Sequence, residues 1–390
     1  MATPAREQIQ AALATVNDPE IRRPITDLGM VESVDVDDRG LVAVKVLLTV
    51  AGCPLKDTIT RDVTTAVERV PGVTGVDLTL GVMSGDQRSG LQEKLRGGQA
   101  QKEITFARPG SLTKVYAIAS GKGGVGKSSV TVNLAAAMAR QGLKVGVVDA
   151  DIYGHSVPAM LGVGDVRPTQ VEDMIMPVPT RPSSFSRGAI SVISIGMLKP
   201  RRDQVVAWRG PMLDRALVQM LSDVYWGDLD MLLLDLPPGT GDIAISLGQH
   251  LPNAEVVVVT TPQEAAAEVA ERAGTMASMM NQRVVGVIEN MSFLPCPHCG
   301  PGHRLEVFGS GGGKRVAQTL STRFGYDVPV LGEVPLDLSL RAGGDVGTPI
   351  VDTHPDTPAA LELTKVATRL SRRGRGLAGM QLGLSPAGRP

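Results

Sequence analysis

Residues 121–128 read GKGGVGKS, and this octet limits the possible fold more than any other part of the chain. It fits the phosphate-loop pattern G-x-x-x-x-G-K-[ST]. An apolar run typical of a strand, 115–119, precedes the octet, and a run typical of a helix, 129–140, follows it. This order of strand, loop and helix distinguishes a phosphate loop from a chance match. The octet therefore predicts a nucleotide-binding protein.

The glycines of the octet allow backbone N–H groups to turn toward a polyphosphate, and the helix that follows points its positive end at the same anion. Lys127 is expected to reach the outer phosphates, and the hydroxyl of Ser128 is expected to ligate Mg²⁺. The loop residues predicted to bind the nucleotide are Gly121, Lys122, Gly123, Gly124, Val125, Gly126, Lys127, Ser128 and Ser129.

After residue 111, apolar runs alternate with helical patterns. The runs are 115–119, 145–148, 190–195, 231–234, 256–260, 284–288 and 328–330. Their nearly continuous apolar character is typical of parallel strands that are covered on both faces. The sequence therefore predicts an α/β fold with a mostly parallel, doubly wound sheet, and ligands are expected at the edge where the strands end.

The part of the chain before this pattern predicts a separate small α/β domain. We expect helices over 6–15 and 55–70 and strands over 30–36, 41–50 and 73–80. The predicted organisation is a small α/β domain at 1–90, a polar linker at 91–110, the phosphate-loop domain at 111–370 and a disordered tail at 371–390.

Composition narrows the range of functions. Lysine and arginine total 39 against 40 acidic residues, so no overall positive charge favours nucleic acid as a partner. No apolar run approaches the roughly 20 residues of a membrane span, and the first residues lack the apolar core of an export signal. Three cysteines in such a chain favour a reducing compartment, so we expect a cytoplasmic protein.

Polar residues follow several of the predicted strands. Asp149 and Asp151 follow 145–148, Asp235 follows 231–234 and Asn290 follows 284–288. An aspartate after an apolar strand is the usual form of the second magnesium motif, so Asp235 is expected to hold Mg²⁺ through water. Asp149 and Asp151 could instead cap a helix, and Asn290 could be a turn residue.

Cys296 and Cys299 form a CxxC pair in a loop rich in proline and glycine. One pair supplies half of the ligands that tetrahedral zinc or a four-iron cluster requires. Three completions are open. A partner subunit could add its own pair, His298 and His303 could complete a zinc site within one chain, or the pair could be a redox dithiol.

The GKGGxGKS form, with Lys122 after the first glycine, resembles the deviant phosphate loop of dimeric ATPases such as the septum-site and partition ATPases. In that group the extra lysine crosses the dimer interface to the partner's phosphates, where a cation stabilises the charge of phosphoryl transfer. The resemblance implies catalytic roles for Lys122, Lys127 and Asp151, with Asp151 orienting the attacking water and Asp149 supporting it. It implies that Asn290 hydrogen-bonds the adenine edge.

Five segments together resemble the Mrp/ApbC iron–sulfur cluster carrier ATPases. They are GKGGVGKS at 121–128, DADIYGHS at 149–156, DLPPGTGD at 235–242, ENMS at 289–292 and CPHC at 296–299. The resemblance implies a homodimer in which Cys296 and Cys299 of both subunits hold a labile [4Fe-4S] cluster. Residues 17–20, 27–31 and 49–55 resemble the small domain of iron–sulfur assembly factors, whose lone cysteine matches Cys53. Cys53 could bind metal or thiol partners, or it could be buried and inert.

The resemblance predicts an ATPase that uses ATP and Mg²⁺, carries a [4Fe-4S] cluster and passes it to apoproteins, with cluster-assembly proteins as further partners. No nucleic acid or membrane partner is expected. The alternatives are a partition or positioning ATPase and a zinc-stabilised ATPase scaffold.

Overall fold

The computed structural model describes residues 4–19, 21, 23–49, 55–87, 90–91, 103–108, 110–152, 154–172, 174–180, 187–199 and 210–373. The chain divides into two compact units. The first comprises Met1–Lys102, Val166–Pro179 and Asp223–Gly227. The second comprises Glu103–Asp165, Thr180–Ser222 and Asp228–Pro390.

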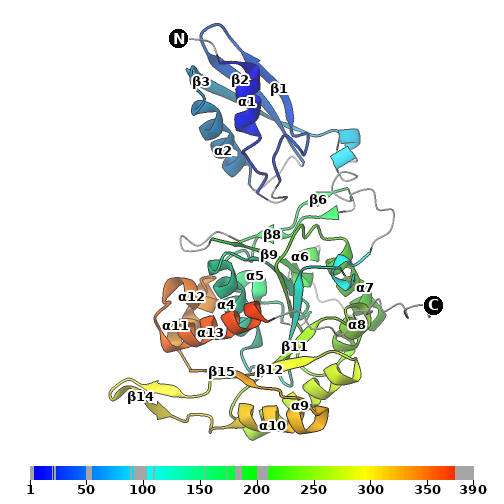
Figure 1. Cartoon of the computed structure of the whole chain (residues 1–390), viewed down its shortest axis with the longest axis vertical. Helices are drawn as coiled ribbons and strands as arrows, with labels where there is room; N and C mark the ends of the chain where they lie inside the picture. Colours follow the sequence, from blue (N-terminus) through cyan, green and yellow to red (C-terminus); the bar gives the residue numbers. More distant parts are fainter. Residues whose placement is uncertain are drawn as a thin grey trace, which may run out of the picture. The chain divides into compact units, whose positions relative to one another are not determined.

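The first unit contains a small sheet with two helices (Figure 1). Its elements are α1 (Arg6–Leu13), β1 (Val31–Val36), β2 (Leu41–Leu48), α2 (Lys56–Glu68) and β3 (Gly75–Val82). β2 is the central strand, and it pairs antiparallel with β1 and parallel with β3. The predicted α/β character of this region is therefore confirmed, with element ends that differ from the expected ones by at most two residues.

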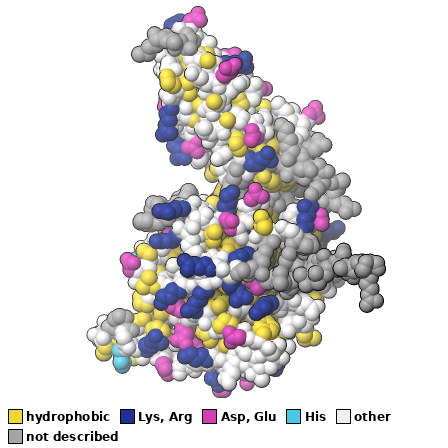
Figure 2. Space-filling model, in the orientation of Figure 1, with side chains coloured by type: hydrophobic (Ala, Val, Ile, Leu, Met, Phe, Trp, Pro, Cys, Tyr) yellow, Lys and Arg dark blue, Asp and Glu magenta, His cyan; other side chains and the backbone are white. Residues whose placement is uncertain are grey.

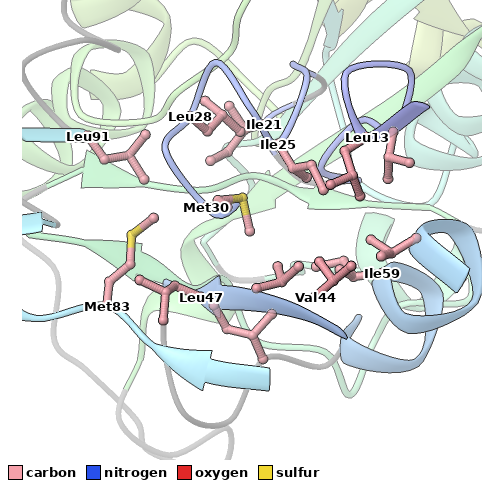
Figure 3. Close-up of a cluster of buried hydrophobic side chains, with 14 of the residues drawn as sticks. Leu13, Ile21, Ile25, Leu28, Met30, Val44, Leu47, Ile59, Met83 and Leu91 are labelled. Carbon is pink, nitrogen blue, oxygen red and sulfur yellow. The ribbon is translucent and has the colours of Figure 1, made fainter. Parts of the chain in front are cut away.

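One hydrophobic cluster holds the first unit together. α2 buries Ile59, Val63 and Val67, which are spaced four residues apart and so lie on one face of the helix. Figure 3 shows Ile59 with Leu13 of α1 and Val44 of β2 in this cluster. Burial of such side chains is the main favourable contribution to folding of a small domain.

The same cluster includes side chains from a later part of the chain. β6 (Gln170–Val171) and β7 (Met174–Ile175) pair antiparallel, and Val171 and Met176 belong to the cluster of the first unit. This hairpin lies within 111–370, which the sequence predicts as one continuous domain. Strands of two residues carry no periodicity, so the sequence gives no indication of it.

A mostly parallel sheet forms the centre of the second unit, where the strand order is β15-β12-β11-β4-β10-β5-β9. These strands are β4 (Lys114–Ser120), β5 (Lys144–Asp149), β9 (Ala189–Ser194), β10 (Met231–Asp235), β11 (Glu255–Thr260), β12 (Val284–Asn290) and β15 (Val330–Val334). All five residues of β10 and all seven of β12 are buried, as expected for parallel strands covered on both faces.

Helices cover both faces of this sheet (Figure 1). They are α4 (Lys127–Arg140), α5 (Val157–Met160), α6 (Ile195–Leu198), α7 (Gly210–Ser222), α8 (Asp242–His250), α9 (Glu264–Met279), α10 (Gly312–Phe324), α11 (Leu338–Val346), α12 (Ile350–Thr353) and α13 (Pro358–Arg372). α4 packs on α13, and α9 packs on α10. The predicted doubly wound α/β fold is therefore confirmed.

Among the strands of the second unit, β15 differs most from its expected limits. β15 begins at Val330, although the sequence predicts a strand over 328–330. Pro329 explains the shift, because proline has no N–H to donate to the sheet and is found at strand ends. α13 continues to Arg372, two residues past the predicted end of the phosphate-loop domain at 370.

Parts of the predicted linker 91–110 are ordered. Leu91 is buried in the cluster of the first unit. In the second unit, the 3₁₀-helix η1 (Thr105–Ala107) buries Phe106, whose carbonyl oxygen accepts a hydrogen bond from Asn253 Nδ2 at 2.8 Å. Residues 92–102 and 374–390, which include most of the predicted tail, lie outside the described residues.

On the face that Figure 2 shows, lysine and arginine side chains are interspersed with acidic ones. This mixture agrees with the net charge of −1. Within the described ranges, no helix has both the length and the apolar character needed to cross a membrane.

Candidate functional site

The phosphate loop connects β4 to α4, as the sequence predicts, and two of its glycines lie too close to neighbouring atoms to carry a side chain. Gly126 has φ 78° and is the N-cap of α4. A Cβ on Gly126 would lie 2.2 Å from Asn290 Nδ2, and one on Gly121 would lie 2.2 Å from the carbonyl carbon of Val269. The loop is therefore packed tightly against β12 and α9, with the free N–H groups of the α4 N-terminus available to an anion.

Asp235, at the end of β10, is the centre of a polar cluster at the start of α4. Its Oδ2 accepts a hydrogen bond from Ser128 Oγ at 2.6 Å, and it lies 2.7 Å from the Lys127 ammonium. Its Oδ1 accepts a hydrogen bond from Thr131 Oγ1 at 2.7 Å. The structure thus brings together three residues predicted for the phosphates and Mg²⁺, and it adds Thr131.

The buried Lys127 ammonium has the property expected of a phosphate ligand. Its contact with Asp235 is an ion pair without hydrogen-bond geometry, and no other group in the described part of the chain accepts a hydrogen bond from it. A buried charge of this kind is costly unless a partner satisfies it. The residues present therefore fit a polyphosphate anion.

Asp149 lies on β5, directly opposite Asp235 in the sheet register. Its oxygens accept hydrogen bonds from the backbone N–H groups of Asp151 at 3.2 Å and Val157 at 3.3 Å, and from Ser194 Oγ at 3.1 Å. Burial, and then the charge of Asp235, raise the pKa of Asp149 well above its usual range. Asp149 therefore organises the segment after β5, and its role in supporting Asp151 stays a prediction.

Asp151 is buried in the turn that follows β5. Its Oδ1 accepts a hydrogen bond from the N–H of Gly154 at 2.9 Å. The carboxylate therefore shapes this turn in the chain as described. Its role in orienting water stays a prediction.

Asn290, the last residue of β12, contacts the phosphate loop. Its Nδ2 donates a hydrogen bond to the carbonyl oxygen of Val125 at 2.9 Å. Its Oδ1 is buried and has no hydrogen-bond partner among the described residues. The resemblance implies that Asn290 hydrogen-bonds the adenine edge. One N–H of the amide already binds the loop, and Oδ1 is an acceptor that no described residue uses.

Lys122 and the segment after Asp235 flank the loop. Lys122 Nζ donates to Gln263 Oε1 at 2.9 Å, at the N-cap of α9. In the DLPPGTGD segment, the N–H of Gly239 donates to the carbonyl oxygen of Ser120 at 2.8 Å. This segment therefore lies next to the phosphate loop, where a group that responds to the γ-phosphate is expected.

The two cysteines lie in a β-hairpin that extends from β12 (Figure 1). It consists of β13 (Leu294–Cys296) and β14 (Gly300–Leu305), which pair antiparallel with Cys296 opposite Gly300. The sequence predicts a loop here. Cys296 is buried and Cys299 is exposed, and both are free thiols. The N–H of Cys299 donates to Cys296 Sγ at 3.3 Å.

The hairpin gathers three possible metal ligands. The ligand atoms of Cys296, Cys299 and His303 all lie within 4.8 Å of one another, whereas His298 is not part of this group. The pKa of Cys296 is lowered to about 7, first by the backbone N–H of Cys299 and then by that of His298, with burial acting in the opposite direction. The thiolate form that binds metals is therefore accessible near neutral pH.

Two features of the site are not evident from the sequence. Thr131 was not predicted, although it lies one helical turn after Ser128 and so on the same face of α4. His303 was one of two equally placed histidines, and only the hairpin register distinguishes it from His298. Cys53 lies outside the described residues.

Three features define a P-loop NTPase. They are the strand–loop–helix unit, the buried Lys127, and Asp235, which accepts a hydrogen bond from Ser128. Comparison with known families agrees with this class. Residues 111–371 match the family described as "NUBPL iron-transfer P-loop NTPase", and residues 6–78 match "Iron-sulfur cluster assembly protein". The chain belongs to the iron-transfer P-loop NTPase family.

Relatives named "Iron-sulfur cluster carrier protein" match nearly the whole chain. The protein of Mycobacterium tuberculosis H37Rv is 58% identical over 381 residues, 98% of this chain and 97% of that protein. The protein of Deinococcus radiodurans is 42% identical over 360 residues, 92% of this chain and 93% of that protein. The predicted resemblance to the carrier ATPases is therefore confirmed, as is the prediction of a nucleoside triphosphatase.

A solved structure supports the same fold. A nucleotide-binding protein of Archaeoglobus fulgidus in complex with ADP is 34% identical, with a TM-score of 0.54, over 68% of this chain and 97% of that protein.

Proposed function

We propose that the protein is an ATP-hydrolysing carrier that binds a [4Fe-4S] cluster and delivers it to cytoplasmic apoproteins. The observation that carries this proposal is the position of the CxxC hairpin. The chain leaves the nucleotide site at Asn290 and reaches Cys296 within six residues along the sequence. The last residue of β12 therefore contacts the phosphate-binding loop, and the first thiol follows it by six residues in the chain.

In this proposal, Lys127 binds the outer phosphates, and Ser128 and Asp235 hold Mg²⁺ directly and through water. The ion would neutralise charge that develops on the phosphate oxygens. Asp151 orients the attacking water, and the backbone N–H groups of residues 123–129 cradle the phosphates. The unpaired Oδ1 of Asn290 supplies an acceptor for the adenine amino group.

The cluster is cargo, and one chain provides only half of its ligands. Cys296 and Cys299 supply two thiolates, whereas a four-iron cluster takes about four. A twofold axis through the hairpin would bring four thiolates together, because an isologous interface repeats the same patch on both subunits. We therefore propose a homodimer, in which Lys122 also crosses to the partner's phosphates and leaves Gln263.

Nucleotide state and cargo would be coupled through the start of the hairpin. Glu289 Oε1 accepts a hydrogen bond from Ser292 Oγ at 2.5 Å, and its Oε2 accepts one from the N–H of Gly313 at 2.5 Å. These bonds connect Glu289, the residue before Asn290, to Ser292 at the start of the hairpin segment and to the first turn of α10. A change at Asn290 on nucleotide binding would thus reach the hairpin through a hydrogen-bonded segment, as coupling between two sites requires.

Residues 1–90 and 111–370 are proposed as the working limits of the assembly-type and ATPase domains. Cluster-assembly proteins would be the donors, with no nucleic acid or membrane partner. The alternative of a partition or positioning ATPase has less support, because the matching family is described as iron-transfer.

Anaerobic reconstitution tests the proposal. We expect about four irons and four sulfides per dimer, a loss of iron in both Cys296→Ala and Cys299→Ala, and transfer of the cluster to an apoprotein. Cys53→Ala should retain the same iron content. A wild-type protein that assembles no cluster, or one that never releases it to an apoprotein, would contradict the proposal.

A further inference from the structure

The hairpin presents more ligands than the CxxC pair. His303, three residues after Gly300 on β14, has a ring nitrogen within 4.8 Å of the sulfur atoms of Cys296 and Cys299. In a tetrahedral site with Zn–S bonds of about 2.3 Å, neighbouring ligand atoms lie about 3.5–3.8 Å apart. Small side-chain rotations therefore suffice to bring all three ligands onto one ion.

Arg304 fixes the strand that carries His303. The Arg304 guanidinium lies 4.1 Å from the centroid of the Phe293 ring and 3.6 Å from Glu333. Successive side chains of a strand point to opposite faces, so anchoring Arg304 on one face directs His303 to the other. The contacts of Arg304 thus keep His303 on the face of the hairpin that carries Cys296 and Cys299.

His298 provides the contrast. It lies between the two cysteines in sequence, is exposed like His303, and yet does not belong to the ligand group. Proximity in sequence therefore does not explain the cluster. β13 and β14 pair Pro295 with Arg304, so His303, the residue before Arg304, lies near Cys296.

We propose that Cys296, Cys299 and His303 of a single protomer form a three-ligand site for one thiophilic divalent ion of the zinc class. Two thiolates and a neutral imidazole balance the charge of such an ion, and zinc favours this sulfur and nitrogen set. The fourth position stays open. The site shares its thiols with the proposed cluster, so a divalent ion on the monomer and a bridging cluster on the dimer exclude each other.

Co²⁺ titration of the reduced, cluster-free full-length chain under anaerobic conditions tests the site. We expect thiolate-to-cobalt charge-transfer bands and the visible bands of tetrahedral cobalt, with one ion per chain. Zn²⁺ should displace the cobalt and co-elute with the monomer in size exclusion followed by metal analysis. His303→Ala should weaken Zn²⁺ binding on the order of 100-fold or more, since loss of even an outer-shell partner costs about 10–100-fold.

His298→Ala is the matched control and should bind Zn²⁺ like the wild type. Circular dichroism and nucleotide binding of His303→Ala establish that the fold is intact, which is expected because His303 is exposed. The inference is overturned if His303→Ala binds Zn²⁺ as tightly as the wild type, or if the ion appears only on dimers at one per two chains.

The inference and the proposed function can fail separately. A wild-type protein that assembles the four-iron cluster but binds no Co²⁺ or Zn²⁺ as a monomer would leave the carrier function standing and remove the three-ligand site. A protein that binds one Zn²⁺ per chain through His303 but assembles no cluster would support the three-ligand site and contradict the carrier function. If both are correct, added Zn²⁺ lowers the yield of reconstituted cluster, and His303→Ala reduces that inhibition while still assembling four irons per dimer.

Discussion

The Lys127 ammonium lies 2.7 Å from Asp235 Oδ2, with only 6% of the lysine side chain and none of the aspartate side chain exposed. Asp149 lies beside Asp235 on the neighbouring strand. Burial and the charge of Asp235 raise the pKa of Asp149, and the charge of Lys127 opposes this rise. The ion pair is therefore built from groups that the proposed reaction uses. Binding of a nucleotide would replace the carboxylate by phosphate as the partner of Lys127.

Lys127→Met is expected to abolish hydrolysis and also to destabilise the nucleotide-free fold. Removing one partner of a buried ion pair typically costs about 3–5 kcal/mol, because the other charge is left uncompensated. Asp235→Asn removes that charge, so the double variant should be more stable than the sum of the single losses predicts. Urea unfolding of the two single variants and the double variant measures this coupling. Additive losses would show that the pair contributes nothing to stability.

Thr131 is expected to act by positioning Asp235. Thr131→Val keeps the side-chain volume but removes the 2.7 Å hydrogen bond to Oδ1. Because a hydrogen bond to a charged group is worth about 1.5–3 kcal/mol, turnover should fall about 10–100-fold. The Mg²⁺ concentration needed for half-maximal activity should rise, with little change in KM for ATP.

Thr131→Ser retains the hydroxyl and should restore turnover to within a few-fold of the wild type. Steady-state kinetics over a range of Mg²⁺ concentrations distinguishes positioning from packing. If the valine variant has the Mg²⁺ dependence of the wild type, Thr131 only fills space.

Much of the nucleotide site could be predicted because each element leaves a local signal. A strand of four buried apolar residues ending in Asp235 is visible in the sequence, and the glycine–lysine–serine order fixes the start of α4. Thr131 leaves no such signal, since a threonine in a buried helix is common without a polar role. Its function depends on β10 and α4 meeting, which is a tertiary relationship.

The hairpin that carries the cysteines also depends on a relationship that the local sequence does not determine. Cys296 and Cys299 are evident from their spacing, but the choice between His298 and His303 depends on strand register. A register shift of one residue would move His303 to the other face, and the sequence of a short hairpin rich in proline and glycine does not determine that register. The hairpin of β6 and β7 cannot be predicted because its two-residue strands carry no periodicity, and the cluster to which Val171 and Met176 belong is formed mainly by residues far away in the sequence.

Gly126→Ala and Gly124→Ala are a matched pair of variants. Comparing them distinguishes the cost of a positive φ from the cost of a steric clash. Both glycines have positive φ, 78° and 81°, but only at Gly126 would a Cβ meet another atom, Asn290 Nδ2 at 2.2 Å. Strain alone costs on the order of 1–3 kcal/mol. Gly126→Ala should therefore lose more ATP affinity and more thermal stability than Gly124→Ala, as measured by calorimetry. Equal losses would mean that the Asn290 side chain moves away from the new Cβ with no cost in free energy.

Gly126→Ala combined with Asn290→Ala provides a check within the same site. Asn290→Ala relieves the collision but leaves the positive φ, and it has a cost of its own because the hydrogen bond to Val125 is lost. Relative to the Asn290→Ala single variant, Gly126→Ala should therefore cost only about as much as Gly124→Ala costs in the wild type. If Gly126→Ala costs as much beside Asn290→Ala as it does in the wild type, the collision is not the cause of the loss.

Lys122 is expected to act on the partner's nucleotide, although in the single chain it donates to Gln263 Oε1 at 2.9 Å. Lys122→Ala should lower kcat more than ATP affinity, because a trans contact stabilises charge in the transition state. Gln263→Ala frees the lysine and should leave kcat at or above that of the wild type. Turnover and ATP-binding assays of both variants measure this difference.

Mixing Lys122→Ala with Asp151→Ala subunits tests the trans contact directly. In a mixed dimer, one composite site carries both defects and the other carries neither, because each site combines Asp151 of one subunit with Lys122 of its partner. An equimolar, fully exchanged mixture should therefore recover about one quarter of wild-type turnover, since about half of its dimers are mixed and each has one intact site. Differently tagged subunits establish that mixed dimers form. If they form and turnover stays at the level of the single variants, Lys122 does not act across an interface.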